Sequence, residues 1–168
     1  VSDAPEVTET HPLVPLTDYN KYKGMSEPLL IKHQSPDFTT VVIRPATVCG
    51  YSPRMRLDLS VNILTNLAVN KGQITVFGGS QKRPNIHVED IARANILAAK
   101  AYVTDEVFNI ASGTETSLEQ LANALLTAMG SNLKLEYGPA RKVNPVSRRL
   151  AAVEKARDKL NFEAGLSL

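Results

Sequence analysis

Segments with the pattern of buried strands alternate with segments of helical periodicity along most of the chain. The run Thr39 to Ile43 is dominated by β-branched residues, which is typical of a strand buried in a parallel sheet. Leu57, Val61, Leu64 and Leu67 follow it at helical spacing. This alternation predicts a layered α/β fold with a largely parallel sheet.

The same reasoning assigns elements along the rest of the chain. Thr17 or Asp18 can cap the first helix, and Ser117 with Gln120 has the spacing of a capping box at the start of a later one. We expect helices at 17–33, 57–70, 89–101, 117–129 and 151–160, strands at 39–43, 74–77, 85–88, 106–111 and 133–137, and a loop at 46–56.

The composition excludes several classes of protein. The 168 residues are 43% hydrophobic, and no apolar run approaches the roughly 20 residues of a membrane helix. The 19 basic and 17 acidic residues are scattered, which argues against a nucleic-acid partner. Cys49 is the only cysteine, so no internal disulfide forms, and three histidines give no zinc cluster. We expect a soluble cytoplasmic protein.

Tyr19 and Lys23 are the first residues that suggest chemistry. They lie four apart on the first predicted helix and so share a face. A neighbouring ammonium group favours the phenolate form of tyrosine, which makes the phenol a usable general acid or base. Glu27, a further four along, extends this face, where a surface pair with Lys23 is the simpler interpretation.

Two more motifs follow in a fixed order. Arg44-Pro45-Ala46-Thr47-Val48 comes directly after the buried strand, and Phe77-Gly78-Gly79-Ser80-Gln81-Lys82-Arg83 leads into Asn85-Ile86-His87-Val88-Glu89-Asp90. With the tyrosine and lysine pair, these motifs resemble the NAD-dependent nucleotide-sugar epimerase/dehydratase family of the extended short-chain dehydrogenase/reductase superfamily. The resemblance covers essentially the whole chain.

The resemblance implies roles for the residues near the cofactor. Tyr19 would exchange a proton with a sugar hydroxyl while hydride passes between the sugar carbon and NAD, and Lys23 would hold the ribose hydroxyls. Pro45 and Val48 would lie against the nicotinamide, at the carboxyl edge of the sheet where such folds bind ligands. NADP is the alternative cofactor.

Substrate contacts are implied at four positions: Thr47, Asn62, Arg83 and Arg141. Arg83 stands where the family grips the substrate diphosphate, a task that suits a permanently charged donor fork. Arg141 resembles a second diphosphate position, for which Arg148 and Arg149 are rivals. For Asn62 a solvated helix face is an alternative interpretation, and we expect Cys49 to be a small core residue.

The family begins with a glycine-rich turn that binds the cofactor pyrophosphate, and this sequence has none. We therefore expect the C-terminal part of a doubly wound, Rossmann-like sheet, with on the order of 100 residues preceding it in the complete enzyme. Residues 1–50 and 86–112 would complete the NAD-binding domain, and residues 51–85 and 113–168 would form a small substrate-binding subdomain.

The sequence leaves several alternatives open. Epimerisation and dehydration share a first oxidation, and a ketone reductase of the same superfamily or an inactive, truncated or sensing protein are further hypotheses. Arg83 argues against an apolar ketone substrate, since such a substrate offers no anion. By the family resemblance we expect a homodimer formed through the helix that carries Tyr19 and Lys23.

Overall fold

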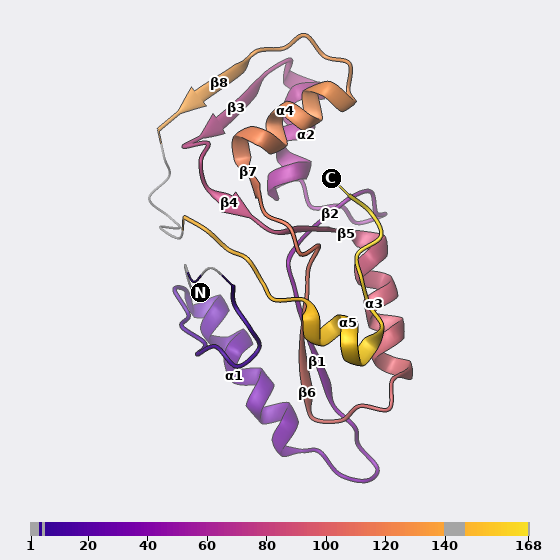
Figure 1. Cartoon of the computed structure of the whole chain (residues 1–168). Coiled ribbons are helices and arrows are strands. Elements are labelled where there is room, and N and C mark those ends of the chain that lie inside the picture. Colours follow the sequence, from indigo (N-terminus) through magenta and orange to yellow (C-terminus); the bar gives the residue numbers. More distant parts are fainter. Residues whose placement is uncertain (1–3, 5, 140–146, 168) are drawn as a thin grey trace.

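The computed structural model describes residues 4, 6–139 and 147–167, and it is an α/β fold built from parallel strand pairs (Figure 1). The helices are α1 (Asp18–Lys32), α2 (Ser60–Lys71), α3 (Val88–Lys100), α4 (Leu118–Ala128) and α5 (Glu154–Leu160). The strands are β1 (Val41–Pro45), β2 (Thr47–Cys49), β3 (Ile74–Phe77), β4 (Lys82–Arg83), β5 (Asn85–His87), β6 (Glu106–Ile110), β7 (Thr116–Ser117) and β8 (Leu135–Gly138).

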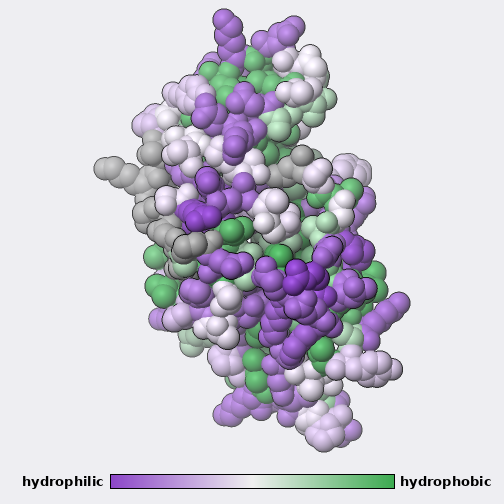
Figure 2. All heavy atoms as spheres, in the orientation of Figure 1, coloured by the Kyte–Doolittle hydropathy of each residue, from purple (hydrophilic) through white to green (hydrophobic). Residues whose placement is uncertain are grey.

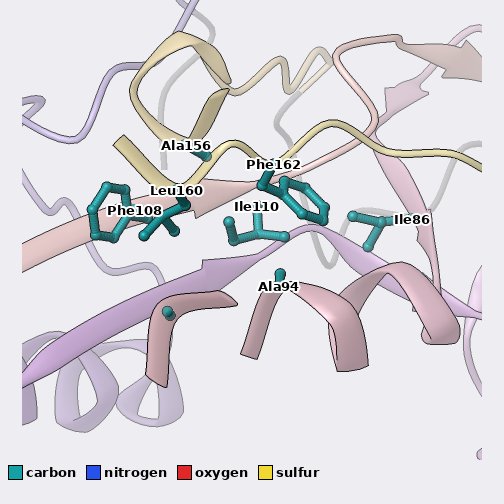
Figure 3. Packing of buried hydrophobic residues seen from close by; sticks show 8 residues of the cluster. Ile86, Ala94, Phe108, Ile110, Ala156, Leu160 and Phe162 are labelled. Atoms are coloured by element: carbon teal, nitrogen blue, oxygen red, sulfur yellow. The ribbon is translucent and has the colours of Figure 1, made fainter. Parts of the chain in front are cut away.

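The long parallel pair β1–β6 organises the first part of the molecule. One face of this pair is covered by α3 and α5, and the buried side chains that meet there include Phe108, Ile110 and Phe162 (Figure 3). Ile86 from β5 joins the same cluster. The sequence predicted a buried strand here, but the residues of β1 are only partly buried or exposed, and Val41 and Ile43 pack against this cluster.

A second, separate cluster lies in the other part of the molecule. Here α2 and α4 pack on the parallel pair β3–β8, and Ile74, Val76, Leu121 and Leu126 are buried between them (Figure 1). Two short pairs complete the described strands, the parallel β2–β5 and the antiparallel β4–β7. The described residues thus form two separate clusters of buried apolar side chains.

The segment that contains α5 packs in the first cluster, together with the residues expected to form the NAD-binding domain. Ala156, Leu160 and Phe162 bury their side chains in the first cluster, with α5 against β6 and α3. The sequence had assigned this segment, within residues 113–168, to the substrate-binding subdomain. Its position is decided by these apolar side chains, while its charged residues form a hydrophilic surface over α5 (Figure 2).

Local capping signals predicted the starts of α1 and α4, whereas α2 and α5 begin three residues later than expected. Thr17 caps α1, and Ser117 with Gln120 forms the capping box of α4. The expected loop at 46–56 is wrong in part, because Thr47–Cys49 form strand β2 by pairing with β5, a partner 38 residues away along the chain. A pairing at that distance leaves no local pattern.

The carboxylate of Asp90 fixes the C-terminal segment to α3. It is 3% exposed and accepts hydrogen bonds from the backbone N–H groups of Gly165 and Leu166 and from the Arg93 side chain. Burial opposes ionisation of Asp90, but these hydrogen bonds outweigh it and hold the pKa of the carboxyl below its ordinary value. Asp90 thus joins α3 to a segment 75 positions away along the chain.

Replacing Asp90 by asparagine should lower the free energy of unfolding by about 2 kcal/mol at neutral pH, since the charged acceptor is lost. The folded-state pKa is the lower one, so the stabilisation is present above the unfolded value of about 3.9 and disappears as the pH falls through the folded value. Urea unfolding of both proteins from neutral to acid pH measures this difference. Glu89→Gln, at the exposed neighbouring acid, is the control, and a pH-independent difference would contradict the interpretation.

Within the described ranges, no helix combines the length and the apolar character that crossing a membrane requires.

Candidate functional site

Helix α1 presents Tyr19 and Lys23 to solvent. Tyr19 is 69% exposed, and none of the residues of α1 is buried. The pKa of Arg56, in the loop before α2, is raised mainly by the hydrogen bond and charge of Asp58, with a smaller electrostatic contribution from Tyr19.

Glu27 pairs with a different residue from the one that its spacing suggested. Its carboxylate accepts two hydrogen bonds from Arg44, at the end of β1, rather than pairing with Lys23. The ion pair joins residues 17 positions apart. Lys23 is thus exposed on α1. It lies one helical turn before Glu27, whose side chain is bound to Arg44 of β1.

Pro45 and Thr47 line a hollow of about 320 Å³ at the carboxyl end of β1, which we call the Thr47 hollow. Asn109 of β6 and Pro84 contribute to the same wall. In open α/β sheets, ligands bind beyond the carboxyl ends of the strands, which is where this hollow lies. Pro45 is itself exposed.

Arg83 lines a second hollow of about 330 Å³, the Arg83 hollow. One wall is apolar and comes from α2 and β3, with Leu64, Leu67 and Phe77, while Asp58 supplies a carboxylate. Arg83 also donates from Nη1 to the carbonyl oxygen of Lys82 at 2.8 Å. An apolar wall with a cation at its rim suits a ligand that has a flat apolar part and an anionic part.

The two hollows flank one segment of chain. Arg83 lines one and the next residue, Pro84, lines the other. The Thr47 amide donates to the Pro84 carbonyl at 3.2 Å, which fixes β2 to this segment. The Arg83–Pro84 segment thus contributes to the lining of both hollows.

Other residues implied by the resemblance have different surroundings. Val48 packs against the first cluster, so a contact with a ligand would involve its backbone. Asn62 is 8% exposed and donates to the Arg56 carbonyl at 2.8 Å, which excludes a solvated helix face. Cys49 is buried, as expected, and burial raises the pKa of its thiol. Arg141 lies outside the described residues.

The rivals for the second diphosphate position also differ. Arg148 forms an ion pair with Glu115, which binds Lys82 as well. Hydrogen bonds from Arg148 first, and then from Lys82, hold the pKa of Glu115 below its ordinary value despite burial. Arg149 instead lines the Thr47 hollow. Of the two rivals, Arg149 is therefore the one that adjoins a hollow.

Gln81 is a candidate that the sequence analysis did not select. It lines the Arg83 hollow, and its buried Oε1 has no hydrogen-bond partner among the described atoms. Its side chain packs on Gly78, which has a positive φ of 83° and no room for a Cβ. A buried acceptor without a partner is costly and suggests a missing donor. The signal in the sequence was its place between the Gly-Gly turn and Arg83.

Comparison with known proteins gives the family. The sequence model of the NAD dependent epimerase/dehydratase family matches residues 2–111. UDP-arabinose 4-epimerase 1 of Arabidopsis thaliana is 24% identical over 96% of this chain and 44% of its own length. A dTDP-glucose 4,6-dehydratase of Actinoplanes sp. is 30% identical, with coverages of 84% and 42%. A ketoreductase of Stigmatella aurantiaca, which acts on a farnesylated dihydroquinoline oxide, is 29% identical, with coverages of 79% and 39%.

Solved structures agree with these relatives. The UDP-glucose 4-epimerase of Thermotoga maritima, in a structure with UDP-glucose, superposes with a TM-score of 0.85 at 30% identity, over 96% of this chain and 52% of its own. MoeE5, in complex with UDP-glucuronic acid and NAD, gives a TM-score of 0.83 at 26% identity, over 96% and 55%. The chain spans about half the length of the relatives it matches. It belongs to the NAD dependent epimerase/dehydratase family.

Proposed function

We propose that this chain supplies the nucleotide-sugar site and the tyrosine and lysine pair of an NAD-dependent epimerase or dehydratase. The observation that carries the proposal is the pair of hollows on either side of Arg83 and Pro84. The nucleoside would occupy the Arg83 hollow against Leu64, Leu67 and Phe77, with its diphosphate at Arg83. The sugar would reach into the Thr47 hollow at the end of β1.

Four of this chain's residues would hold one end of NAD. Tyr19 and Lys23 are exposed on one helix face, and Pro45 is exposed where the strand ends. These three residues and the backbone of Val48 would hold the nicotinamide ribose. NAD supplies the hydride acceptor when bound. Tyr19 Oη would take the proton of the sugar hydroxyl as its carbon is oxidised, and Lys23 would favour the charged phenolate.

The other substrate contacts follow from the same arrangement. Thr47 lines the sugar end. Asn62 would act through the loop that it fixes at Arg56, and Arg141 would complete the diphosphate site. Gln81 Oε1 would accept from a donor group of the nucleoside. We further propose a homodimer through α1, since Tyr22, Met25 and Leu29 form an exposed stripe along it.

Uridine diphosphate tests the Arg83 hollow directly, because described residues between 58 and 118 line it. Arg83→Ala should weaken binding about 10- to 100-fold in calorimetry, the value of a hydrogen bond to a charged group. Arg157→Ala, at an exposed arginine on α5, is the control and should bind normally.

Two results would contradict the proposal. One is equal affinity of the Arg83 and Arg157 variants for uridine diphosphate. The other is absence of binding by the unmodified chain together with binding of an apolar ketone, which would favour a reductase like the Stigmatella aurantiaca relative.

A further inference from the structure

The position of α1 is not fixed by a core. None of its residues is buried, and the stripe that faces the body of the molecule consists of the partly buried Asn20, Gly24, Glu27 and Ile31. Apolar burial, which usually holds a helix in place, is therefore small here. Polar contacts must supply much of the precision with which this helix is held.

Arg44 supplies the polar contact to the helix. Its Nε donates to Glu27 Oε1 at 2.9 Å and its Nη2 to Glu27 Oε2 at 2.5 Å, a two-pronged pair. The two side chains are only 22% and 15% exposed, so water screens the pair less than it screens a surface pair. Two parallel hydrogen bonds also fix the direction of the helix side chain.

The same arginine reaches the chain segment that precedes the helix. Its Nη1 donates to the carbonyl oxygen of Glu9 at 3.0 Å. Asn109, the partner of Arg44 in the β1–β6 register, donates from its backbone to Glu9 Oε1 at 2.8 Å and from its side chain to the Val7 carbonyl at 2.9 Å. The cross-strand pair of Arg44 and Asn109 thus holds both α1 and the segment that precedes it.

We propose that Arg44 is a positioning residue, which fixes the helix carrying Tyr19 and Lys23 relative to Pro45 at the end of β1. Lys23 precedes Glu27 by one helical turn, and Pro45 follows Arg44 directly. The ion pair therefore ties the two groups of residues that the proposed function places around the nicotinamide. The catalytic part of this inference rests on that proposed function, whereas the anchoring of the helix does not.

Arginine is required by this geometry. The planar guanidinium directs its donors at Glu27 and at Glu9 simultaneously, while a lysine ammonium group has no such fork. Arg44→Lys keeps the charge and removes the fork, and Glu27→Gln keeps the shape and removes the charge. The exposed pair Arg157 and Asp158, which joins neighbours within α5, provides a matched control in Arg157→Lys.

Hydrogen exchange of the backbone amides tests the anchoring. In Arg44→Lys and in Glu27→Gln, the amides of residues 21–32 should exchange about tenfold faster, while those of α3 keep their rates. The double variant should exchange no faster than the faster single variant, because both remove one interaction. Unchanged exchange of α1 in Glu27→Gln, or an equal effect of Arg157→Lys, would overturn the proposal; the near-isosteric glutamine serves if the Arg44 variant fails to fold.

Kinetics test the catalytic part. With NAD and a nucleotide sugar, Glu27→Gln should lower kcat about tenfold or more and leave KM within about twofold, since the pair touches neither reactant. A rise in KM with unchanged kcat would overturn the positioning role. If the unmodified protein neither binds uridine diphosphate nor turns over a nucleotide sugar, the proposed function fails, while the exchange measurement still decides whether Arg44 anchors the helix.

Discussion

Phe108→Ala is expected to lower the free energy of unfolding by about 3–5 kcal/mol, the range for removing a fully buried aromatic side chain. Phe108 is 0% exposed and lies between the β1–β6 pair and the helices α3 and α5 (Figure 3). The ammonium group of Lys155 also lies 5.0 Å from the centre of its ring. Such a loss is a large part of the 5–15 kcal/mol that stabilises a typical domain.

Urea unfolding, followed by far-ultraviolet circular dichroism, measures this loss. Tyr102→Ala is the matched control, because Tyr102 is a fully exposed aromatic residue in the turn after α3 and its removal should change stability by less than about 0.5 kcal/mol. A loss below about 1 kcal/mol in Phe108→Ala would show that the cluster does not hold β6 in place.

The part of the fold that the sequence predicted depends on local signals. The capping box of Ser117 and Gln120 and the N-cap Thr17 act within three residues, so the pattern alone locates them. His87 is similar, since its Nδ1 accepts a hydrogen bond from the Glu89 amide two residues along the chain. The order of the elements and the α/β class followed from such signals and from periodicity.

What the sequence missed depends on contacts between distant segments. Asp90 lies in the first turn of α3, and its hydrogen bonds to Gly165 and Leu166 could not be inferred because the tail has no regular pattern. Lys23 lies one helical turn from Glu27 and is its obvious partner in the sequence. Glu27 pairs with Arg44 instead, because the guanidinium group makes two hydrogen bonds in a partly buried position. Interactions between residues far apart in the sequence leave no local pattern from which they could be predicted.

The candidate site, like the fold, could be predicted only where its signals are local. Its motifs were visible as residue types in order, and the comparisons confirm the family that they indicated. The two hollows and the place of Gln81 in one of them required the fold, since Leu64, Phe77 and Arg83 come from different elements. Roles of individual residues within the site stay predictions.

Tyr19→Phe tests the chemical step of the proposed function. If the Tyr19 phenol carries the proton of the sugar hydroxyl, kcat for a nucleotide sugar with NAD should fall about 10²- to 10⁴-fold, the usual contribution of a positioned acid or base, and KM should change little. Hydride transfer, followed through the absorbance of the reduced nicotinamide or through product formation, gives both constants.

Tyr22→Phe offers a closely matched control on the same helix. Tyr22 is 67% exposed against 69% for Tyr19, but it lies three residues further along and so points about 60° away from it around the helix axis. Losing its hydroxyl should leave kcat within about twofold, because no reacting group lies beside it in the proposed site. Equal losses in the two variants would assign the effect to the helix as a whole. A normal Tyr19→Phe enzyme would remove the phenol from the mechanism and leave Lys23 with a binding role alone.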